Sequence, residues 1–308
     1  MTPLAIGSEL DLRRGDRVVR LTRLEQVWWP GEGIRKRDVV DYYRAVARAI
    51  LPHLRGRPFT MKRHYNGPRS PFVWIKDAPP ELPGWVPRAP LPARSRGGAL
   101  VEYPLVEDDL ALLWMVEFGC VDMHVWTSRA DRPERPDQVL FDLDSAGAPF
   151  ADVVAAALLV RTALDALGLH SLPKTTGGDG LHVHIPIERR HTHSQAREFC
   201  EIVAAALVRS ARGLVTTERS LARRHGVFVD TKMNGHGQQI VSAYSVRPRP
   251  GAPVATPLRW EELRDDLDPR RLTMDVVRER VERDGDLFAP LLARRQRLGR
   301  ALARLRRR

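Results

Sequence analysis

Apolar and polar positions along the chain follow two different periods, and together they predict a mixed α/β protein. Between residues 36 and 54 the apolar positions recur at the spacing of an amphipathic helix, and residues 151–168 and 193–211 are two further helix candidates. Short β-rich runs lie between them, namely RVVRL, RPFTMKRHY, PFVWIK, VDMHVW, QVLFDLD, LHVHIPI, GVFVD and QIVSAYSV. Several of these runs follow one another without a helix. We therefore expect an α+β fold with mixed or antiparallel sheets flanked by helices, not a regular doubly wound sheet.

We expect the chain to form one domain over residues 1–308, and we find no internal repeat in it. Residues 17–76 form an N-terminal part, residues 100–265 a core, and residues 266–308 a helical, basic C-terminal segment. The stretch at residues 87–98, PRAPLPARSRGG, is rich in Pro, Gly and Arg and predicts an exposed loop between the first two parts.

The net charge of +12 is concentrated at the C-terminus, where residues 294–308 contain eight arginines and no acidic residue. Four leucines of this region fall on one helical stripe, at positions 291, 298, 302 and 305. The pattern predicts a terminal helix that docks through its leucines. Its arginine face either contacts DNA phosphates or is simply solvated, and the sequence leaves both open.

The sequence also limits where the protein works. Charged residues occupy the positions where a secretory signal would be apolar, and the longest aliphatic run, VVAAALLV, is too short to span a bilayer. The two cysteines, Cys120 and Cys200, do not support a disulfide scaffold or a cysteine-based zinc site. We expect a cytoplasmic, nucleoid-associated protein with no membrane contact.

Two strand candidates end in acidic residues. QVLFDLD ends with Asp142 and Asp144, whose side chains share one strand face, and GVFVD ends with Asp230. Carboxylates this close repel each other unless a cation lies between them, and a two-metal site for phosphoryl transfer would supply it. The alternative is that the strands simply run out into polar turns with all three acids solvated.

A glycine-rich loop, KTTGGDGLHVHIPI, precedes another strand candidate. Gly177, Gly178 and Gly180 allow close approach of the backbone to a phosphate, and His182 and His184 then share one strand face. The loop is not a P-loop, because no GK[ST] follows. A plain turn followed by two core or edge histidines remains the alternative.

In their order, these motifs resemble the polymerase domain of bacterial DNA ligase D, which belongs to the archaeo-eukaryotic primase superfamily. The resemblance rests on DLD, then KTTGGDGLHV, then VFVD, then YSVRPRPGAPVATPLRWEEL. The opening stretch LTRLEQVWWPGEGIRKRDVVDYYRAVARAILPHLRGRPFTMKRHYNG is similar as well, so the likeness extends from about residue 17 to residue 263. It implies a primase-like catalytic core. Since no ligase or nuclease domain is visible, we expect a stand-alone polymerase.

The resemblance also implies a set of site residues. Asp142, Asp144 and Asp230 would be the catalytic ligands of Mn²⁺ or Mg²⁺ in a two-metal site. Nucleotide contacts would come from six residues: Lys62, Trp74, His124, Thr176, His182 and Arg247. Trp74 would stack on a base, although a place in the core remains its alternative.

A pocket for a DNA 5′-phosphate is the third implied feature, and it would fall within residues 17–76. Lys36 matches one of its residues, and Arg23 and Gln26 stand where related enzymes carry an asparagine and a lysine. In the glycine-rich loop, Asp179 stands where many relatives have a lysine.

Together these features predict a template-directed nucleotidyltransferase that extends primer 3′ ends at DNA gaps or breaks. By resemblance it would prefer ribonucleotides and serve non-homologous end joining or other DNA repair. Its partners would be gapped or overhanging DNA, NTP or dNTP, Ku and a separate DNA ligase. Two rival functions are a metal-dependent phosphodiesterase or nuclease that uses the same acids, and a catalytically weak DNA-end-binding module.

Overall fold

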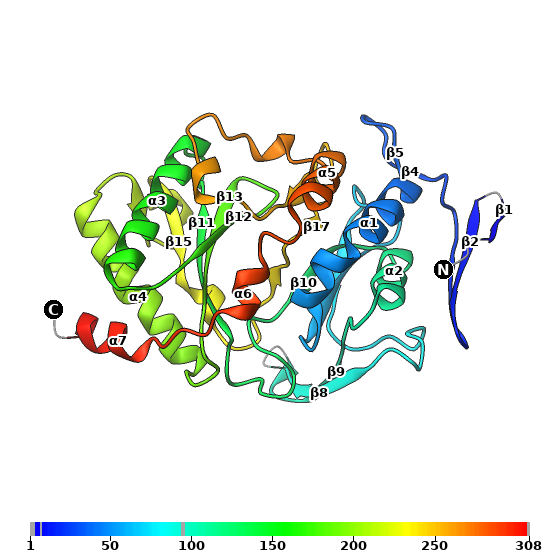
Figure 1. The fold of residues 1–308 in the computed structure, drawn as a ribbon, viewed down its shortest axis with the longest axis horizontal. Helices are drawn as coiled ribbons and strands as arrows, with labels where there is room; N and C mark the ends of the chain where they lie inside the picture. Colours follow the sequence, from blue (N-terminus) through cyan, green and yellow to red (C-terminus); the bar gives the residue numbers. More distant parts are fainter. Residues whose placement is uncertain (1–3, 7, 94–95, 307–308) are drawn as a thin grey trace. The chain divides into compact units, whose positions relative to one another are not determined.

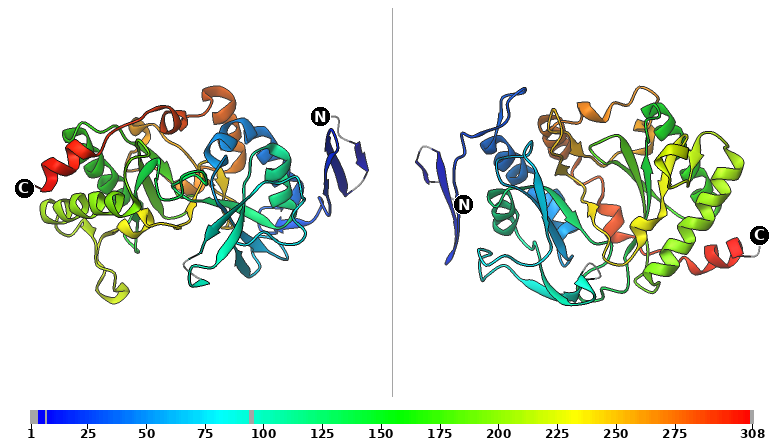
Figure 2. Two further views of the ribbon diagram at one scale, coloured as in Figure 1. Left: turned by 90° about the horizontal axis from the view of Figure 1, so that it is seen from below. Right: turned by 180° about the vertical axis from the view of Figure 1, so that it is seen from behind.

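The computed structural model of the chain describes residues 4–6, 8–93 and 96–306. Figure 1 labels most of its helices and many of its strands, and Figure 2 shows the fold from two further sides. The chain divides into two compact units, each built from three separate segments. Unit 1 comprises Met1–Val125, Val241–Val254 and Arg270–Asp286, and unit 2 comprises Trp126–Ile240, Ala255–Pro269 and Leu287–Arg308. That the chain acts as a single polymerase domain stays a prediction.

Unit 1 combines one long helix and two shorter ones with short antiparallel sheets. Its elements are β1 (Leu4–Ile6), β2 (Glu9–Arg14), β3 (Arg17–Leu21), β4 (Val27–Trp29), β5 (Ile34–Arg35), α1 (Lys36–Leu54), β6 (Phe59–His64), β7 (Phe72–Ile75), β8 (Arg88–Pro92), β9 (Leu100–Pro104), α2 (Asp109–Glu117), β10 (Cys120–Val125), β17 (Ser245–Val246) and α5 (Met274–Asp284). Strands β10, β6 and β7 lie side by side in one antiparallel sheet, with β16 (Ile240–Val241) next to β10. This sheet carries three of the predicted nucleotide contacts, Lys62 on β6, Trp74 on β7 and His124 on β10.

Helices α1 and α2 pack together and form much of the core of unit 1 (Figure 1). The buried residues of α1 include Val39, Tyr43, Val46 and Ile50, at the helical spacing that predicted this element, and the predicted range is confirmed. Helix α2 was not predicted, because every residue from 110 to 116 is apolar and buried and the segment therefore shows no amphipathic period.

Unit 2 contains a five-stranded sheet in the order β12-β13-β11-β15-β14. Its elements are β11 (Gln138–Asp144), α3 (Phe150–Ala166), β12 (Leu172–Thr175), β13 (Gly180–Pro186), α4 (His193–Ser210), β14 (Val215–Thr216), β15 (Val227–Asp230), α6 (Ala289–Ala293), α7 (Gly299–Arg306) and the 3₁₀ helices Leu221–Arg223, Thr231–Asn234 and Trp260–Glu262. A fourth 3₁₀ helix, Pro269–Arg271, and β18 (Val254–Ala255) lie at boundaries between the segments. Helices α3 and α4 pack against the sheet, and Phe199 of α4 contacts Phe141 of β11.

Three predictions from the sequence were wrong in detail. Residues 87–98 are not a plain loop, because β8 pairs with β9 over its whole length. The apolar side chains of Ala89 and Leu91 are buried at a two-residue period that the intervening prolines obscure. Proline is tolerated because β8 lies at the edge of a two-stranded sheet. Arg94 and Ser95, within the same stretch, lie outside the described residues.

The other two wrong predictions concern a strand and a helix that are each interrupted in the structure. QIVSAYSV forms two short strands, β16 and β17, because the chain turns at Tyr244, whose φ is +64°. The C-terminal leucine stripe does not lie on one helix, since α6 ends at Ala293 and α7 begins at Gly299. Leu291, Leu298 and Leu302 are nevertheless buried, so the predicted docking through leucines is confirmed.

None of the helices in the described part of the chain has the length and hydrophobicity that a membrane crossing would require.

Candidate functional site

Three acidic residues lie on one face of the unit 2 sheet. Asp142 and Asp144 are two residues apart on β11, and the antiparallel register sets Asp142 directly opposite Asp230 of β15. Residues two apart on a strand and residues directly opposite across strands point to the same face. Asp144 is exposed, and Asp142 and Asp230 are half-buried. The sheet therefore gathers the three acids that the sequence singled out.

The same face carries a row of basic residues beside these acids. The register places His182 of β13 opposite Asp142, and Lys174 of β12 opposite His182. The Nε2 atom of His182 lies 3.2 Å from Oδ1 of Asp142. Both His182 and Lys174 are buried, Lys174 with only 1% of its surface exposed. The sequence did not single out Lys174, because only the cross-strand register places it in this row.

The oxygen donors of the three acids suit a hard divalent cation such as Mg²⁺ or Mn²⁺. Two of these side chains have partners within unit 2: Oδ1 of Asp230 accepts a hydrogen bond from the Lys232 amide at 2.9 Å, and Asp142 contacts His182. Among the described residues, no group of three or more His, Cys, Asp and Glu side chains is already arranged to hold a metal ion. Asp142, Asp144 and Asp230 are the residues whose carboxylate oxygens would hold such an ion.

The glycine-rich loop closes tightly beside these acids. The backbone amide and hydroxyl of Thr176 both donate to the carbonyl oxygen of Gly180, at 3.0 and 3.2 Å. A Cβ atom on Gly180 would lie 2.6 Å from the carbonyl oxygen of Leu143, so only glycine fits at this point. Gly180 pairs with Asp144, and the loop therefore brings Thr176 close to the end of β11. The side chain of Asp179 is exposed.

In unit 1, a buried carboxylate is surrounded by three of the predicted nucleotide contacts. Asp122 of β10 is fully buried, with 0% of its surface exposed. Its Oδ2 atom lies 3.0 Å from Nε2 of His124, 3.4 Å from Nζ of Lys62 and 4.0 Å from Nε of Arg247. These side chains come from β10, β6 and the segment after β17. We refer to Asp122, His124, Lys62 and Arg247 as the basic cluster.

The basic cluster explains how a carboxylate can remain ionised without exposure to solvent. Burial alone would raise the pKa of Asp122, but His124, Arg247 and Lys62 together hold this pKa well below its usual range. Asp122 was not among the residues predicted from the sequence, although its two-residue spacing from His124 in VDMHVW was a usable signal. A register shift between Cys120 and Met123 also redirects the strand here, as bulges near functional sites often do.

An exposed aromatic strand borders the basic cluster. Trp74 of β7 is 48% exposed, so the alternative that it belongs to the core is wrong. Its ring contacts the ring of His124 edge-on at 5.1 Å, and Nζ of Lys62 lies 4.2 Å from the ring centre of Phe72. Phe72 and Trp74 lie two residues apart on the strand and contact each other at 5.8 Å. The strand thus presents two aromatic faces next to a cation, a combination suited to stacking with bases.

Tyr43 of α1 fixes the backbone on both sides of the basic cluster. Its hydroxyl donates to the carbonyl oxygen of Val121 and accepts from the amide of Val246 at 3.0 Å. Val121 precedes Asp122 and Val246 precedes Arg247, so one buried hydroxyl ties together the two segments that carry them.

We expect Tyr43→Phe to lower the free energy of unfolding by about 1–3 kcal/mol, because a buried carbonyl and a buried amide lose their partner. Urea denaturation would measure the change. Tyr65→Phe, at an exposed position, is the matched control and should change stability by less than ~0.5 kcal/mol. An equal, small effect of both substitutions would contradict the assigned role of Tyr43.

Comparison with known proteins identifies the family. The family model described as "LigD, primase-polymerase domain" matches residues 35–288. The chain belongs to this family. The non-homologous end joining DNA repair protein LigD of Mycobacterium tuberculosis H37Rv is 34% identical over 283 residues, which cover 89% of this chain and 37% of that protein. LigD of Bacillus subtilis is 29% identical over 273 residues, covering 88% of this chain and 43% of that protein.

A solved structure agrees with the family assignment. The polymerase domain of Mycobacterium tuberculosis ligase D, in complex with DNA, matches with a TM-score of 0.84 and 32% identity, covering 90% of this chain and 99% of that one. The predicted primase-like α+β fold is thereby confirmed. The chain spans little more than a third of the length of the mycobacterial LigD protein.

The residues predicted to form the LigD 5′-phosphate pocket lie together, but one of them is buried. Lys36 is 2% exposed, and its Nζ atom lies 2.6 Å from Oε2 of Glu117 and 5.8 Å from the ring centre of Trp28. The amides of Lys36 and Arg37 donate to the carbonyl oxygens of Gln26 and Leu24. Two backbone amides in the first turn of α1 are therefore already engaged, whereas Arg23 is exposed.

We expect Lys36→Met to lower the free energy of unfolding by about 2 kcal/mol, since Glu117 would keep its charge but lose its counter-ion. Thr22 still donates to Glu117 through its amide and hydroxyl, which limits the loss. Chemical denaturation of the single variant and of Lys36→Met/Glu117→Gln gives the test. If the double variant were no more stable than Lys36→Met, the ion pair would not be the cause.

Several arginines of the basic C-terminal segment are engaged in contacts within unit 2. Arg306 forms two hydrogen bonds with Glu198 of α4, at 2.8 and 2.7 Å, and Arg297 pairs with Glu188. Arg304 donates to the carbonyl oxygen of Ala166. These contacts favour a docking role for this part of the segment, and a DNA contact remains an expectation for its other exposed arginines.

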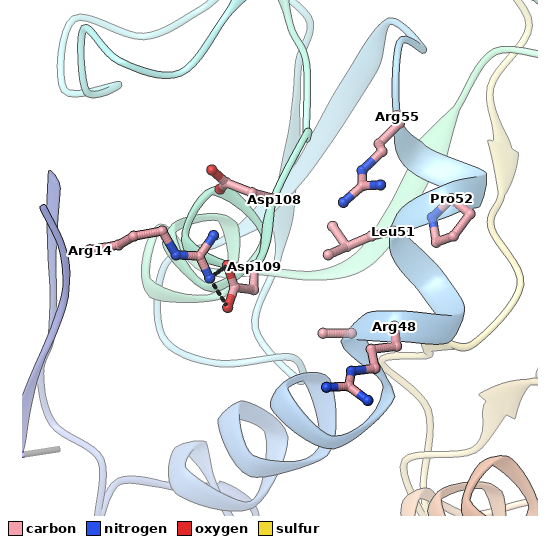
Figure 3. A pocket seen from close by; sticks show the side chains of 8 residues that line it. Arg14, Arg48, Leu51, Pro52, Arg55, Asp108 and Asp109 are labelled. Carbon is pink, nitrogen blue, oxygen red and sulfur yellow. Dashed lines mark hydrogen bonds and ion pairs between the residues drawn. The ribbon is translucent and has the colours of Figure 1, made fainter. Parts of the chain in front are cut away.

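The described pockets of unit 1 lie away from the predicted site residues. Figure 3 shows a pocket lined by Arg48 of α1, by Arg55, which directly follows α1, and by Arg14, which pairs with Asp109 of α2. Its volume is about 450 Å³. A second pocket, of about 550 Å³, has an acidic lining that includes Glu32 and Asp41. No residue of the basic cluster lines either pocket.

Proposed function

We propose that this chain is a metal-dependent nucleotidyltransferase that extends primer 3′ ends at DNA gaps or breaks under the direction of a template. The observation that carries the proposal is the register of the unit 2 sheet, which sets Asp142 opposite Asp230 with Asp144 on the same face. Membership of the LigD primase-polymerase family supports the same reaction class.

In unit 2, Asp142, Asp144 and Asp230 would hold Mg²⁺ or Mn²⁺. When bound, the metal would make the primer 3′-hydroxyl more acidic and neutralise charge on the triphosphate. His182 contacts Asp142 and restrains the orientation of its carboxylate. The hydroxyl of Thr176, beside the end of β11, would donate to a phosphate oxygen in place of its present bond to Gly180.

In unit 1, the basic cluster would bind the triphosphate. Lys62 and Arg247 are basic side chains, and a guanidinium group can bind phosphate through two hydrogen bonds. Trp74 would stack on a base of the template or of the incoming nucleotide, and its exposure leaves its ring available for this contact.

We further propose that the biological substrate is broken or gapped DNA in non-homologous end joining, with ribonucleotides preferred over deoxyribonucleotides. The names of the LigD relatives and the DNA bound to the solved mycobacterial domain support this step. Arg23, Gln26 and Lys36 would recognise a 5′-phosphate across the gap, with exposed Arg23 the leading contact. Ku and a separate ligase would act with the enzyme.

A single experiment separates the proposal from its rivals. A labelled primer on a gapped duplex with a 5′-phosphate is incubated with NTP or dNTP in Mn²⁺ or Mg²⁺, and the primer length is read. A longer primer, with NTP used better than dNTP, is the expected result. A shortened primer would favour the nuclease instead. An unchanged primer on bound DNA would favour the end-binding module and would make Asp179 the first residue to examine.

A further inference from the structure

The tautomer of His124 has a consequence for nucleotide binding. An ionised carboxylate only accepts hydrogen bonds, so the Nε2 atom of His124, 3.0 Å from Oδ2 of Asp122, must carry a hydrogen. In a neutral imidazole the other nitrogen, Nδ1, then has a lone pair and no hydrogen. Within the described part of the chain, Nδ1 is buried and has no hydrogen-bond partner. A lone pair repels a phosphate oxygen, so the neutral ring cannot donate to a triphosphate from this atom.

We propose that Asp122 is a positioning residue for the triphosphate, and that nucleotide binding is accompanied by uptake of one proton at Nδ1 of His124. The inference rests on the proposed function and specifies how its triphosphate site works. Protonated His124 would donate from Nε2 to Asp122 and from Nδ1 to a phosphate oxygen. Asp122 does not touch the nucleotide and acts through His124, Lys62 and Arg247.

The electrostatic surroundings of His124 favour this coupling. Burial lowers the pKa of His124, Asp122 raises it, and Arg247 and Lys62 lower it again, so that the pKa lies below its ordinary value of 6.5. Across the sheet, Lys62 comes from β6 and the uncharged Trp74 from β7, whereas Asp122 shares β10 with His124. The free ring is therefore neutral at pH 7. A bound triphosphate adds several negative charges and raises the pKa, so a proton enters with the nucleotide.

Replacement of Asp122 distinguishes two explanations, because they predict opposite changes in nucleotide affinity. If the carboxylate acted only as a charge, Asp122→Asn would remove repulsion and tighten nucleotide binding. If it positions the cluster, the same substitution leaves His124 without its stabilising partner and lets Lys62 and Arg247 repel each other. The proposal therefore predicts that Asp122→Asn binds the nucleotide roughly 10- to 100-fold more weakly, although Asp122 has the same sign of charge as the triphosphate.

The decisive test is calorimetric titration of the unaltered protein with ATP and Mg²⁺ at pH 7, in buffers of different ionisation enthalpy. The dependence of the heat on the buffer gives the number of protons taken up. We expect between about 0.5 and 1 proton for the unaltered protein and close to none for His124→Gln, as the linkage of binding to ionisation requires. Asp122→Asn should bind ATP more weakly and lose most of the uptake, whereas Asp16→Asn, at an exposed position of unit 1, should match the unaltered protein.

The outcomes separate this inference from the proposed function. ATP binding without proton uptake, or binding as tight in Asp122→Asn as in the unaltered protein, would overturn the inference and leave the polymerase proposal standing. No ATP binding at all would overturn both. Since Asp122→Asn could fail to fold, nitrogen chemical shifts of His124 in the unaltered protein give a second test. They should show Nδ1 without hydrogen before ATP is added and both nitrogens with hydrogen afterwards.

Discussion

Replacement of Asp144 by asparagine is expected to reduce primer extension by at least ~10³-fold, equivalent to about 4 kcal/mol of transition-state stabilisation. Asp144 ends β11 on the face that also carries Asp142 and Asp230, and an amide is a weak ligand for Mg²⁺ or Mn²⁺ compared with a carboxylate. Because the side chain is exposed, the fold should tolerate the change. Single-turnover incorporation of one nucleotide at a gapped duplex measures the rate directly.

The control for this variant is Asp165→Asn, which removes an exposed acid of unit 2 that lies on α3 and pairs with Arg161. Its rate should stay within about twofold of the unaltered protein, since surface substitutions of this kind change little. DNA binding should be retained by both variants. Extension by Asp144→Asn within tenfold of the unaltered rate would show that Asp144 is not a metal ligand.

The second large effect is expected at Arg247. Arg247→Met should reduce kcat/KM for the nucleotide by roughly 10²-fold, about 3 kcal/mol, mainly through a higher KM. The substitution removes a phosphate-binding guanidinium and also takes one cation away from buried Asp122, whose Oδ2 lies 4.0 Å from Nε of Arg247. Steady-state kinetics at varied nucleotide concentration would separate the two parameters.

Arg247→Lys provides the conservative comparison. Lysine keeps the positive charge but lacks the planar guanidinium that can form two hydrogen bonds with a phosphate. The KM of Arg247→Lys should therefore lie between that of the unaltered protein and that of Arg247→Met. Arg20→Met, at an exposed position of β3, controls for loss of one arginine in unit 1 and should leave KM unchanged. An unchanged KM in Arg247→Met, with only a loss of stability, would assign Arg247 a structural role.

The parts of the fold that the sequence predicted best have a strong period or clear ends. Helix α1 and strand β11 have the predicted bounds, because their apolar positions recur regularly and polar turns or charged residues follow. Helix α2 was missed because it is apolar all round, and β8 because two prolines obscure its alternation. The interleaved composition of the two units is set by contacts between distant segments, which local patterns do not encode.

The candidate site, too, depends on contacts between distant segments that local sequence patterns do not encode. The two-residue spacing of Asp142 and Asp144 was enough to place them on one face, but only the strand register reveals that Asp230 lies opposite Asp142 and that Lys174 lies in the same row. Asp122 was overlooked because a lone acid inside an apolar strand looks like a solvated position until its burial is known. Lys36 could not be recognised as the partner of Glu117, which is 81 residues away in the chain.

The central claim, that Asp142, Asp144 and Asp230 share a metal site, is tested most directly by anomalous diffraction from crystals of the protein grown with gapped DNA, ATP and Mn²⁺. We predict anomalous density for Mn²⁺ with carboxylate oxygens of all three residues about 2.2 Å away, and its loss in Asp144→Asn crystals. Mn²⁺ bound elsewhere on the protein, with no density at the ends of β11 and β15, would contradict the account.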